Sequence, residues 1–388
     1  MVTVRSGPLS GTRVVEMAAI GPAPFAAMML ADHGAEVIRI DRPGAEWSQT
    51  DVLLRSRRSI ELDLKNPGGV AVARRLIASA DALLEGFRPG VMERMGLGPE
   101  ICLGDNPRLV YGRMTGWGQT GPLASAPGHD INYISVAGAL HAFGRAGDKP
   151  TPPINLVGDF GGGGMMLAFG VVSALLNVKA TGQGQTIDVA MTDGAAVLMS
   201  MIWGMKAAGR WQDARGVNLL DTGAYFYDCY LTRDGKFISL GCIEPQFYRA
   251  ARDRLGLTDP DFDAQQDPAA WPRLRAKLAD LIRQRTRDEW SSLLEGTDAC
   301  FAPVLSMAEA PDHPHNRERR TFVEVGGVTQ PAPAPRYCRT QTQLPEAPQR
   351  PGTSRLRVLS ELGYTQAEVR ALAAQGAFGP TPPDQARE

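Results

Sequence analysis

RVVEMAAIGPAPFAAMMLADHGAEVIRI spans residues 13–40, and it contains two β-branched runs separated by an apolar helical pattern. The runs at residues 13–17 and 36–40 predict buried strands, and residues 24–33 predict a helix closed by Gly34. Two strands joined through a helix are typical of a parallel sheet. The stretch therefore predicts a domain in which strands and helices alternate.

The same alternation continues through the first half of the chain. Asn66 predicts the cap of a helix whose first residue is Pro67, and residues 159–180 predict a glycine-rich start followed by a long apolar helix. Further strands are expected at residues 59–64, 82–85, 109–112 and 186–191. We therefore expect an α/β fold with a mainly parallel sheet.

The pattern changes after about residue 220. Residues 225–243 predict a β-hairpin that turns at residues 233–236, and residues 268–296 predict two amphipathic helices. A proline-rich connector follows, and Thr365 opens a capping box for a last helix. The predicted domains are a large α/β domain (1–190), a connector (191–224), a small α+β domain (225–320), and a connector with a C-terminal segment that returns to the large domain (321–388).

Composition excludes several classes of protein. The 388 residues carry 41 Lys and Arg against 42 Asp and Glu, so the net charge of −1 argues against a nucleic-acid partner. The five cysteines are widely spaced without a C-x-x-C motif, which argues against disulfides and structural zinc. We see no run of 18 apolar residues and no apolar signal segment in residues 1–11, so we expect no membrane partner and a cytoplasmic location.

The loop after the first strand lacks the glycine fingerprint of a dinucleotide site. Residues 18–23 are AAIGPA rather than G-x-G-x-x-G, although Asp41 ends the second strand where a ribose-binding carboxylate would stand. A nucleotide-like ligand at the carboxyl ends of the strands is still compatible with the alternation. Basic residues that follow strands or begin helices suit phosphate binding, with solvated surface charge as the alternative: Arg42, Lys65, Arg88 and Arg94.

Three fragments carry residues suited to acid–base chemistry. His129 and Asp130 precede an apolar helix, whose free N–H groups would stabilise an oxyanion, although a simple helix cap explains them equally well. Asp159 precedes four glycines that allow close approach of backbone or ligand, with tight helix packing as the alternative. Glu244 ends an apolar strand and precedes a proline, so we expect it at the rim of a cleft, with a plain surface carboxylate as the alternative.

These fragments resemble the family III CoA-transferases and, among them, the α-methylacyl-CoA racemases. The resemblance runs along nearly the whole chain, from residues 7–16 through 39–43, 62–65 and 86–90. The His129 fragment, the Asp159 fragment and residues 241–248 are specific to the racemases, which usually have alanine where Cys242 stands here.

The resemblance implies an interlocked homodimer of chains, each with a large Rossmann-like CoA-binding domain and a smaller α+β domain. It implies that His129 and Asp159 are the acid–base pair, and that Glu244 of the other subunit hydrogen-bonds the histidine. Tyr133 would lie beside the thioester, with Asp130 near the oxyanion. The implied CoA contacts are Ile20, Arg42, Leu64, Lys65, Arg88 and Arg94.

The implied reaction inverts the α-carbon of a 2-methyl-branched acyl-CoA thioester by 1,1-proton transfer through an enolate. Asp159 then needs a raised pKa, which burial would supply. No metal or cofactor is expected, because CoA is part of the substrate. The alternatives are a CoA-transferase that uses Asp159 as a nucleophile, which requires neither His129 nor Glu244, and a CoA-binding protein without catalysis.

Overall fold

The computed structural model describes residues 5–379. The parts of the predicted domains at residues 1–4 and 380–388 lie outside the described residues. The chain forms two compact units, a larger one of residues 5–137, 154–198 and 320–379, and a smaller one of residues 138–153 and 199–319.

The larger unit is built on a six-stranded sheet, which confirms the predicted α/β class. All neighbouring strands are parallel and stand in the order β3-β2-β1-β4-β5-β6. This order reverses direction between β1 and β4, and ligands of such sheets bind at that point, outside the carboxyl ends of the strands. The strands are β1 Arg13–Met17, β2 Glu36–Asp41, β3 Arg57–Glu61, β4 Ala82–Glu85, β5 Val110–Thr115 and β6 Gln185–Ala190.

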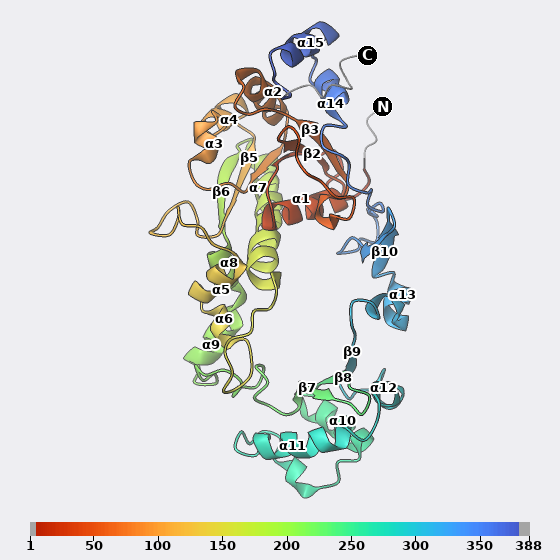
Figure 1. Ribbon diagram of the computed structural model, residues 1–388. Helices are drawn as coiled ribbons and strands as arrows, with labels where there is room; N and C mark the ends of the chain where they lie inside the picture. Colours follow the sequence, from red (N-terminus) through yellow and green to blue (C-terminus); the bar gives the residue numbers. More distant parts are fainter. Residues whose placement is uncertain (1–4, 380–388) are drawn as a thin grey trace. The chain divides into compact units, whose positions relative to one another are not determined.

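Helices cover both faces of this sheet (Figure 1). On one face Leu30 of α1 and Leu167 of α7 pack against Val14 and Leu84 in one buried cluster. The other face packs mainly against α2, α4 and α14. The remaining elements of this unit include the antiparallel pair β10 and β11. Bounds are α1 Pro22–Asp32, η1 Val52–Leu54, α2 Pro67–Ala78, α3 Val91–Arg94, α4 Pro99–Asp105, α5 Asp130–Val136, α8 Met191–Leu198, β10 Phe322–Val325, β11 Val328–Pro331, α14 Arg355–Glu361 and α15 Gln366–Ala374.

The glycine-rich segment begins as a π-helix, η2 (Leu156–Met165), and continues as the α-helix α7 (Met166–Thr181). Together they are long and apolar enough to cross a membrane by length and composition, which the search for 18 apolar residues did not foresee. Their Val, Leu, Phe, Met and Ala residues keep the mean hydropathy high, while the glycines and Ser173 interrupt the run of apolar side chains. Because α7 packs on the sheet through Leu167 and Val171, it has the contacts of a core helix.

The smaller unit contains the predicted hairpin and the two predicted amphipathic helices. Strands β7 (Tyr227–Leu231), β8 (Phe237–Gly241) and β9 (Phe301–Val304) form an antiparallel sheet that packs with α10 (Pro245–Leu255), α11 (Trp271–Ile282) and α12 (Arg287–Leu294) around Trp290. The segment 138–153 joins this unit through Arg145, which donates two hydrogen bonds to Asp228 at 2.9 and 2.8 Å. The other elements are α6 Ala139–Ala142, α9 Ser200–Ala207, η3 Pro260–Asp263, η4 Ala310–Asp312 and α13 Pro314–Arg319.

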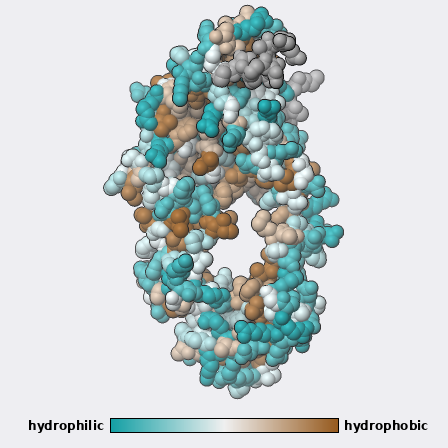
Figure 2. All heavy atoms as spheres, in the orientation of Figure 1, coloured by the Kyte–Doolittle hydropathy of each residue, from teal (hydrophilic) through white to brown (hydrophobic). Residues whose placement is uncertain are grey.

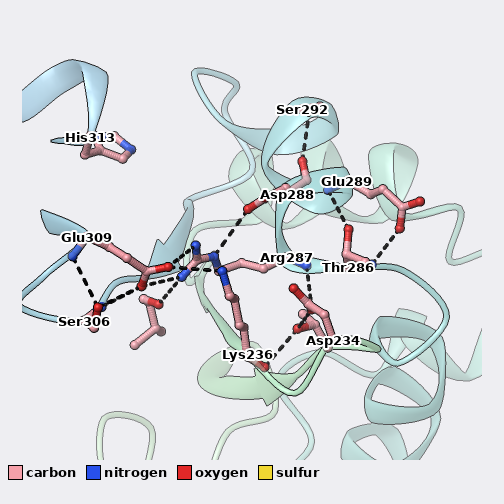
Figure 3. A network of polar contacts seen from close by, with 12 residues as sticks. Asp234, Lys236, Thr286, Arg287, Asp288, Glu289, Ser292, Ser306, Glu309 and His313 are labelled. Carbon is pink, nitrogen blue, oxygen red and sulfur yellow. Dashed lines mark hydrogen bonds and ion pairs between the residues drawn. The ribbon is translucent and has the colours of Figure 1, made fainter.

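An ionic network holds the segment after β9 onto this unit (Figure 3). Arg287 is buried and donates to Glu309 at 3.0 and 2.8 Å, and Lys236 of the hairpin donates to the same carboxylate at 3.1 Å. These cations, together with N–H and O–H donors of Ser306, hold the pKa of Glu309 far below its usual range. The network therefore ties the hairpin, α12 and η4 together.

Candidate active site

A cavity of about 740 Å³ opens at the carboxyl ends of the strands, where the sheet order reverses. Its wall includes residues 20–22 after β1, 86–89 after β4 and 114–117 at the end of β5. Parallel strands bring these loops to one edge of the sheet, so residues far apart in sequence line one space. Both His129 and Asp159 line it.

His129 stands immediately before the first residue of α5 and its side chain is exposed to the cavity. Its own backbone N–H donates to Oδ1 of Asn132 at 3.0 Å, a capping contact that fixes the turn. In contrast, the backbone N–H groups of Asp130 and Ile131 have no hydrogen-bond partner within the described part of the chain. Such free first-turn donors suit an oxygen that becomes negative during a reaction.

Asp159 lies in the first turn of η2 and is half-buried. Asn155 donates its side-chain N–H to Asp159 Oδ2 at 2.6 Å, and the Asp159 backbone N–H donates to Asp130 Oδ2 at 2.7 Å. Burial raises the pKa of the Asp159 carboxyl, and the charge of Asp130 raises it further, against the lowering effects of Asn155 and His129. The net direction is upward, which is the direction that a proton donor needs.

The glycines after Asp159 serve close packing. A Cβ on Gly194 of α8 would lie 1.8 Å from the carbonyl oxygen of Gly162, so the backbones of α8 and η2 touch. Gly163 and Gly164 likewise approach Met191 and Phe25 too closely for a side chain. Of the two explanations offered by the sequence, the structure supports tight packing of η2 among α1, α5 and α8.

Tyr133 lies in the cavity wall, and its hydroxyl is already engaged. The phenol O–H donates to the carbonyl of Gly128, and the ring meets Trp117 edge-on with centroids 4.9 Å apart. Burial and the charge of Asp159 raise the pKa of this phenol. Its single donor therefore supports the turn that precedes His129.

A second cavity, of about 650 Å³, shares Ile20 and Phe87 with the first, so the two are adjacent. Of the predicted CoA contacts, Ile20, Arg42, Leu64 and Lys65 line this second cavity. Arg88 lines the first, and Arg94 lines neither. Together the cavities offer one long cleft with cationic groups along it.

Sequence reasoning missed two residues of this cleft, Asn155 and Arg39. Asn155 precedes Asp159 by four residues, a helical spacing that could have revealed the pair. Arg39 lines the second cavity and pairs at 3.1 Å with Asp41, which also lines it, and the strand-end position of Asp41 noted in the sequence was the signal that could have pointed to Arg39.

Glu244 lies in the smaller unit, where it is exposed immediately before the first residue of α10. Its neighbour Cys242 is buried in the core of the same unit, and burial raises the pKa of that thiol to about 12. Cys242 is therefore a core residue with no thiolate at neutral pH. His313 pairs with Glu295 at 2.8 Å, and residues 5–379 contain no group of three or more His, Cys, Asp or Glu that could hold a metal ion.

Comparisons with known proteins agree along the chain. Residues 9–353 match CoA-transferase family III. The mouse protein named alpha-methylacyl-CoA racemase is 46% identical over 367 residues, covering 94% of this chain and 96% of its own. The human protein of that name is 44% identical over 368 residues, with the same coverage. A crystal structure of a CaiB/BaiF family protein from Brucella suis matches with a TM-score of 0.81 and 25% identity, covering 92% of this chain and 100% of that one.

Proposed function

This chain belongs to CoA-transferase family III, and we propose that it is a racemase that inverts the α-carbon of 2-methyl-branched acyl-CoA thioesters. The observation that carries this proposal is the presence of His129 and Asp159 in the wall of one cavity, each from a different element. Two relatives that match nearly the whole chain are named for this activity.

The reaction needs two proton-transfer groups and support for an enolate. A thioester acidifies its α-C–H, but no side chain removes that proton at neutral pH unless the developing oxyanion is stabilised. We assign that stabilisation to the free N–H groups of Asp130 and Ile131 in the first turn of α5, directly after His129 in the cavity wall, although neither residue itself lines the cavity. In one direction neutral His129 removes the α-proton and protonated Asp159 returns one to the opposite face. In the other direction ionised Asp159 removes it and protonated His129 returns it.

The long cleft accommodates the rest of the substrate. In this proposal Arg42 and Lys65, which line the second cavity, would pair with phosphate oxygens of the CoA nucleotide, and Arg88, which lines the first cavity, would lie at the thioester end. CoA is thus held as part of the substrate, and the proton transfers need no metal or redox cofactor. We place the protein in the cytoplasm, where acyl-CoA thioesters are available.

We further propose a homodimer in which Glu244 of one subunit hydrogen-bonds His129 of the other. That bond would fix the tautomer of His129 and favour its protonated form. Exposed hydrophobic residues on the larger unit support a subunit interface, because a monomer rarely leaves such side chains in water. Figure 2 shows this hydrophobic surface over α5 and α8, and its exposed members include Ile131, Val136, Val197 and Leu198.

The direct test incubates the protein with one enantiomer of a 2-methylacyl-CoA in D₂O and follows the α-carbon by NMR. Deuterium should enter and the stereocentre should drift toward a mixture, whereas a His129→Ala variant should invert neither enantiomer and should lose exchange of the enantiomer that His129 deprotonates. Absence of exchange and inversion with several acyl chains would refute the racemase proposal, as expected for a CoA-binding protein without catalysis.

The alternative within this family is CoA transfer with Asp159 as the nucleophile, which would form an acyl anhydride and then an enzyme thioester. Hydroxylamine trapping distinguishes the two, because only a transferase accumulates an acyl or CoA adduct at Asp159. A racemase instead exchanges the α-proton without any carboxylate acceptor. The transferase mechanism gives no role to His129, so retention of full activity by His129→Ala would favour it.

A further inference from the structure

Asp130 follows His129 directly, yet the two side chains have different surroundings. His129 is exposed and lines the active-site cavity, whereas Asp130 is 3% exposed and does not line it. The Asp130 carboxylate instead reaches η2, where Oδ2 accepts the backbone N–H of Asp159 at 2.7 Å. The dipeptide His129-Asp130 therefore supplies one member of the proposed acid–base pair and contacts the other, Asp159.

The contact between Asp130 and η2 is close enough to require glycine. A Cβ on Gly158 would lie 2.4 Å from Asp130 Oδ2 and 3.1 Å from Cγ2 of Ile134. The carboxylate thus lies directly against the backbone that leads into Asp159. Because Gly158 is buried in this contact, a shift of the carboxylate would move the turn that carries Asp159.

Helix capping does not account for this carboxylate. An acidic residue in a first turn usually accepts N–H groups of its own helix. The hydrogen bond that Asp130 accepts comes from another element, and its second oxygen, Oδ1, is buried without a hydrogen-bond partner among residues 5–379. Leaving a buried carboxylate oxygen unpaired is costly, and such groups concentrate where function requires them.

The charge of Asp130 also acts on Asp159. Two nearby carboxylates disfavour a second negative charge, so Asp130 raises the pKa of Asp159 and keeps a proton on it. Asn155, which donates a hydrogen bond to the Asp159 carboxylate, has the opposite effect and lowers this pKa. Asp130 therefore acts on Asp159 in two ways, through the hydrogen bond to its backbone and through its negative charge.

We infer that Asp130 is a positioning residue that acts through Asp159, holding the backbone of Asp159 in the cavity wall. This inference rests on the proposed racemase function for its kinetic consequence. The physical link between the two carboxylates exists independently of the reaction, which allows the two ideas to be tested apart.

The test compares Asp130→Asn, which keeps an acceptor oxygen and removes the charge, with Asp130→Ala, which removes both. Titration of Asp159 is followed by NMR in ligand-free protein labelled with ¹³C at aspartate carboxyls, its signal being identified by its loss in Asp159→Asn. We expect Asp130→Asn to lower the pKa of Asp159. Asp188→Asn is the matched control, because Asp188 also accepts a backbone N–H, that of Gln119 at 3.0 Å, but lines neither cavity.

Kinetics complete the comparison. Asp130→Ala should lower kcat on the order of a hundredfold at nearly constant KM, since a misplaced acid–base group loses rate rather than affinity. Asp130→Asn should recover much of that loss and move the acidic limb of the kcat/KM profile to lower pH. An unmoved Asp159 titration and pH profile in both variants, with only a lower Tm, would overturn the inference. A shifted titration in a protein without any racemase activity would instead refute the proposed function alone.

Discussion

The side-chain amide of Asn155 donates to Oδ2 of Asp159 over 2.6 Å, from the position immediately before the first residue of η2. This bond stabilises the ionised carboxylate, so it lowers the pKa of Asp159 while burial raises it. The pKa of Asp159 is therefore set by two opposing effects, the hydrogen bond from Asn155 and the burial of the carboxyl group.

Replacing Asn155 by alanine should raise the pKa of Asp159, because the lowering hydrogen bond is lost while burial remains. Each active form of the proposed pair carries one proton, either on Asp159 or on His129. The form with a proton on both residues is inactive, so the rate falls at low pH as Asp159 becomes protonated in the form that carries the proton on His129. The acidic limb of the kcat/KM profile should therefore move to higher pH in both reaction directions. A shift to lower pH, or none, would contradict this account of Asn155.

Much of the fold was predictable because its signals are local. The β-branched runs gave β1 and β2, the Asn66–Pro67 cap began α2, and the capping box at Thr365 began α15. The expected family and α/β class are likewise confirmed. The membership of residues 138–153 was not foreseen, because it depends on Arg145 meeting Asp228, 83 residues later.

The site was predictable in its residue types and less so in its contacts. His129 and Asp159 were selected from short motifs, and both line the first cavity. The π-helical backbone of η2 and the bond from Asp159 to Asp130 depend on packing between α5, α8 and η2, which no local pattern in the sequence specifies. Their catalytic roles stay predictions, to be decided by experiments such as the following.

Removing one member of the pair should separate exchange from inversion. With Asp159→Asn, His129 can still remove the α-proton of one enantiomer and return deuterium to the same face, so that enantiomer should exchange without inverting. With His129→Gln, only the opposite enantiomer should exchange. The measurement is NMR of each enantiomer in D₂O with each variant. Exchange of the same enantiomer by both variants would contradict a two-base mechanism.

The cationic residues of the second cavity should contribute to affinity more than to rate. Arg42→Ala removes a cation that lines this cavity, and because the side chain is exposed to solvent, KM should rise on the order of tenfold with little change in kcat. Arg42→Lys should recover part of the loss. Steady-state kinetics at two salt concentrations provide the check, since the wild-type KM should depend more strongly on salt.

Arg94 offers a comparison of the same residue type. It was predicted to contact CoA but lines neither cavity, so Arg94→Ala should raise KM less than Arg42→Ala does. An equal or larger rise with Arg94→Ala would mean that the bound CoA extends beyond the two cavities, along α3.

The proposed dimer predicts that each site combines His129 of one subunit with Glu244 of the other. In a mixed dimer of a His129→Ala chain and a Glu244→Gln chain, one site would then carry both substitutions and the other site neither. Mixing two impaired variants should therefore restore about half of the wild-type activity per mixed dimer. Differently tagged chains, co-expressed and purified through both tags, provide the mixed species for the D₂O assay.

If His129 and Glu244 of the same subunit worked together, each site of the mixed dimer would instead contain one substitution. Activity would then equal the mean of the two parent variants, and no mixture could exceed the better one. The His129→Ala, Glu244→Gln double variant paired with a wild-type chain is the matched control. If His129 and Glu244 pair between subunits, this control dimer has no intact site and should be less active than the dimer of two single variants. If they pair within a subunit, the control dimer has one intact site and should be the more active of the two.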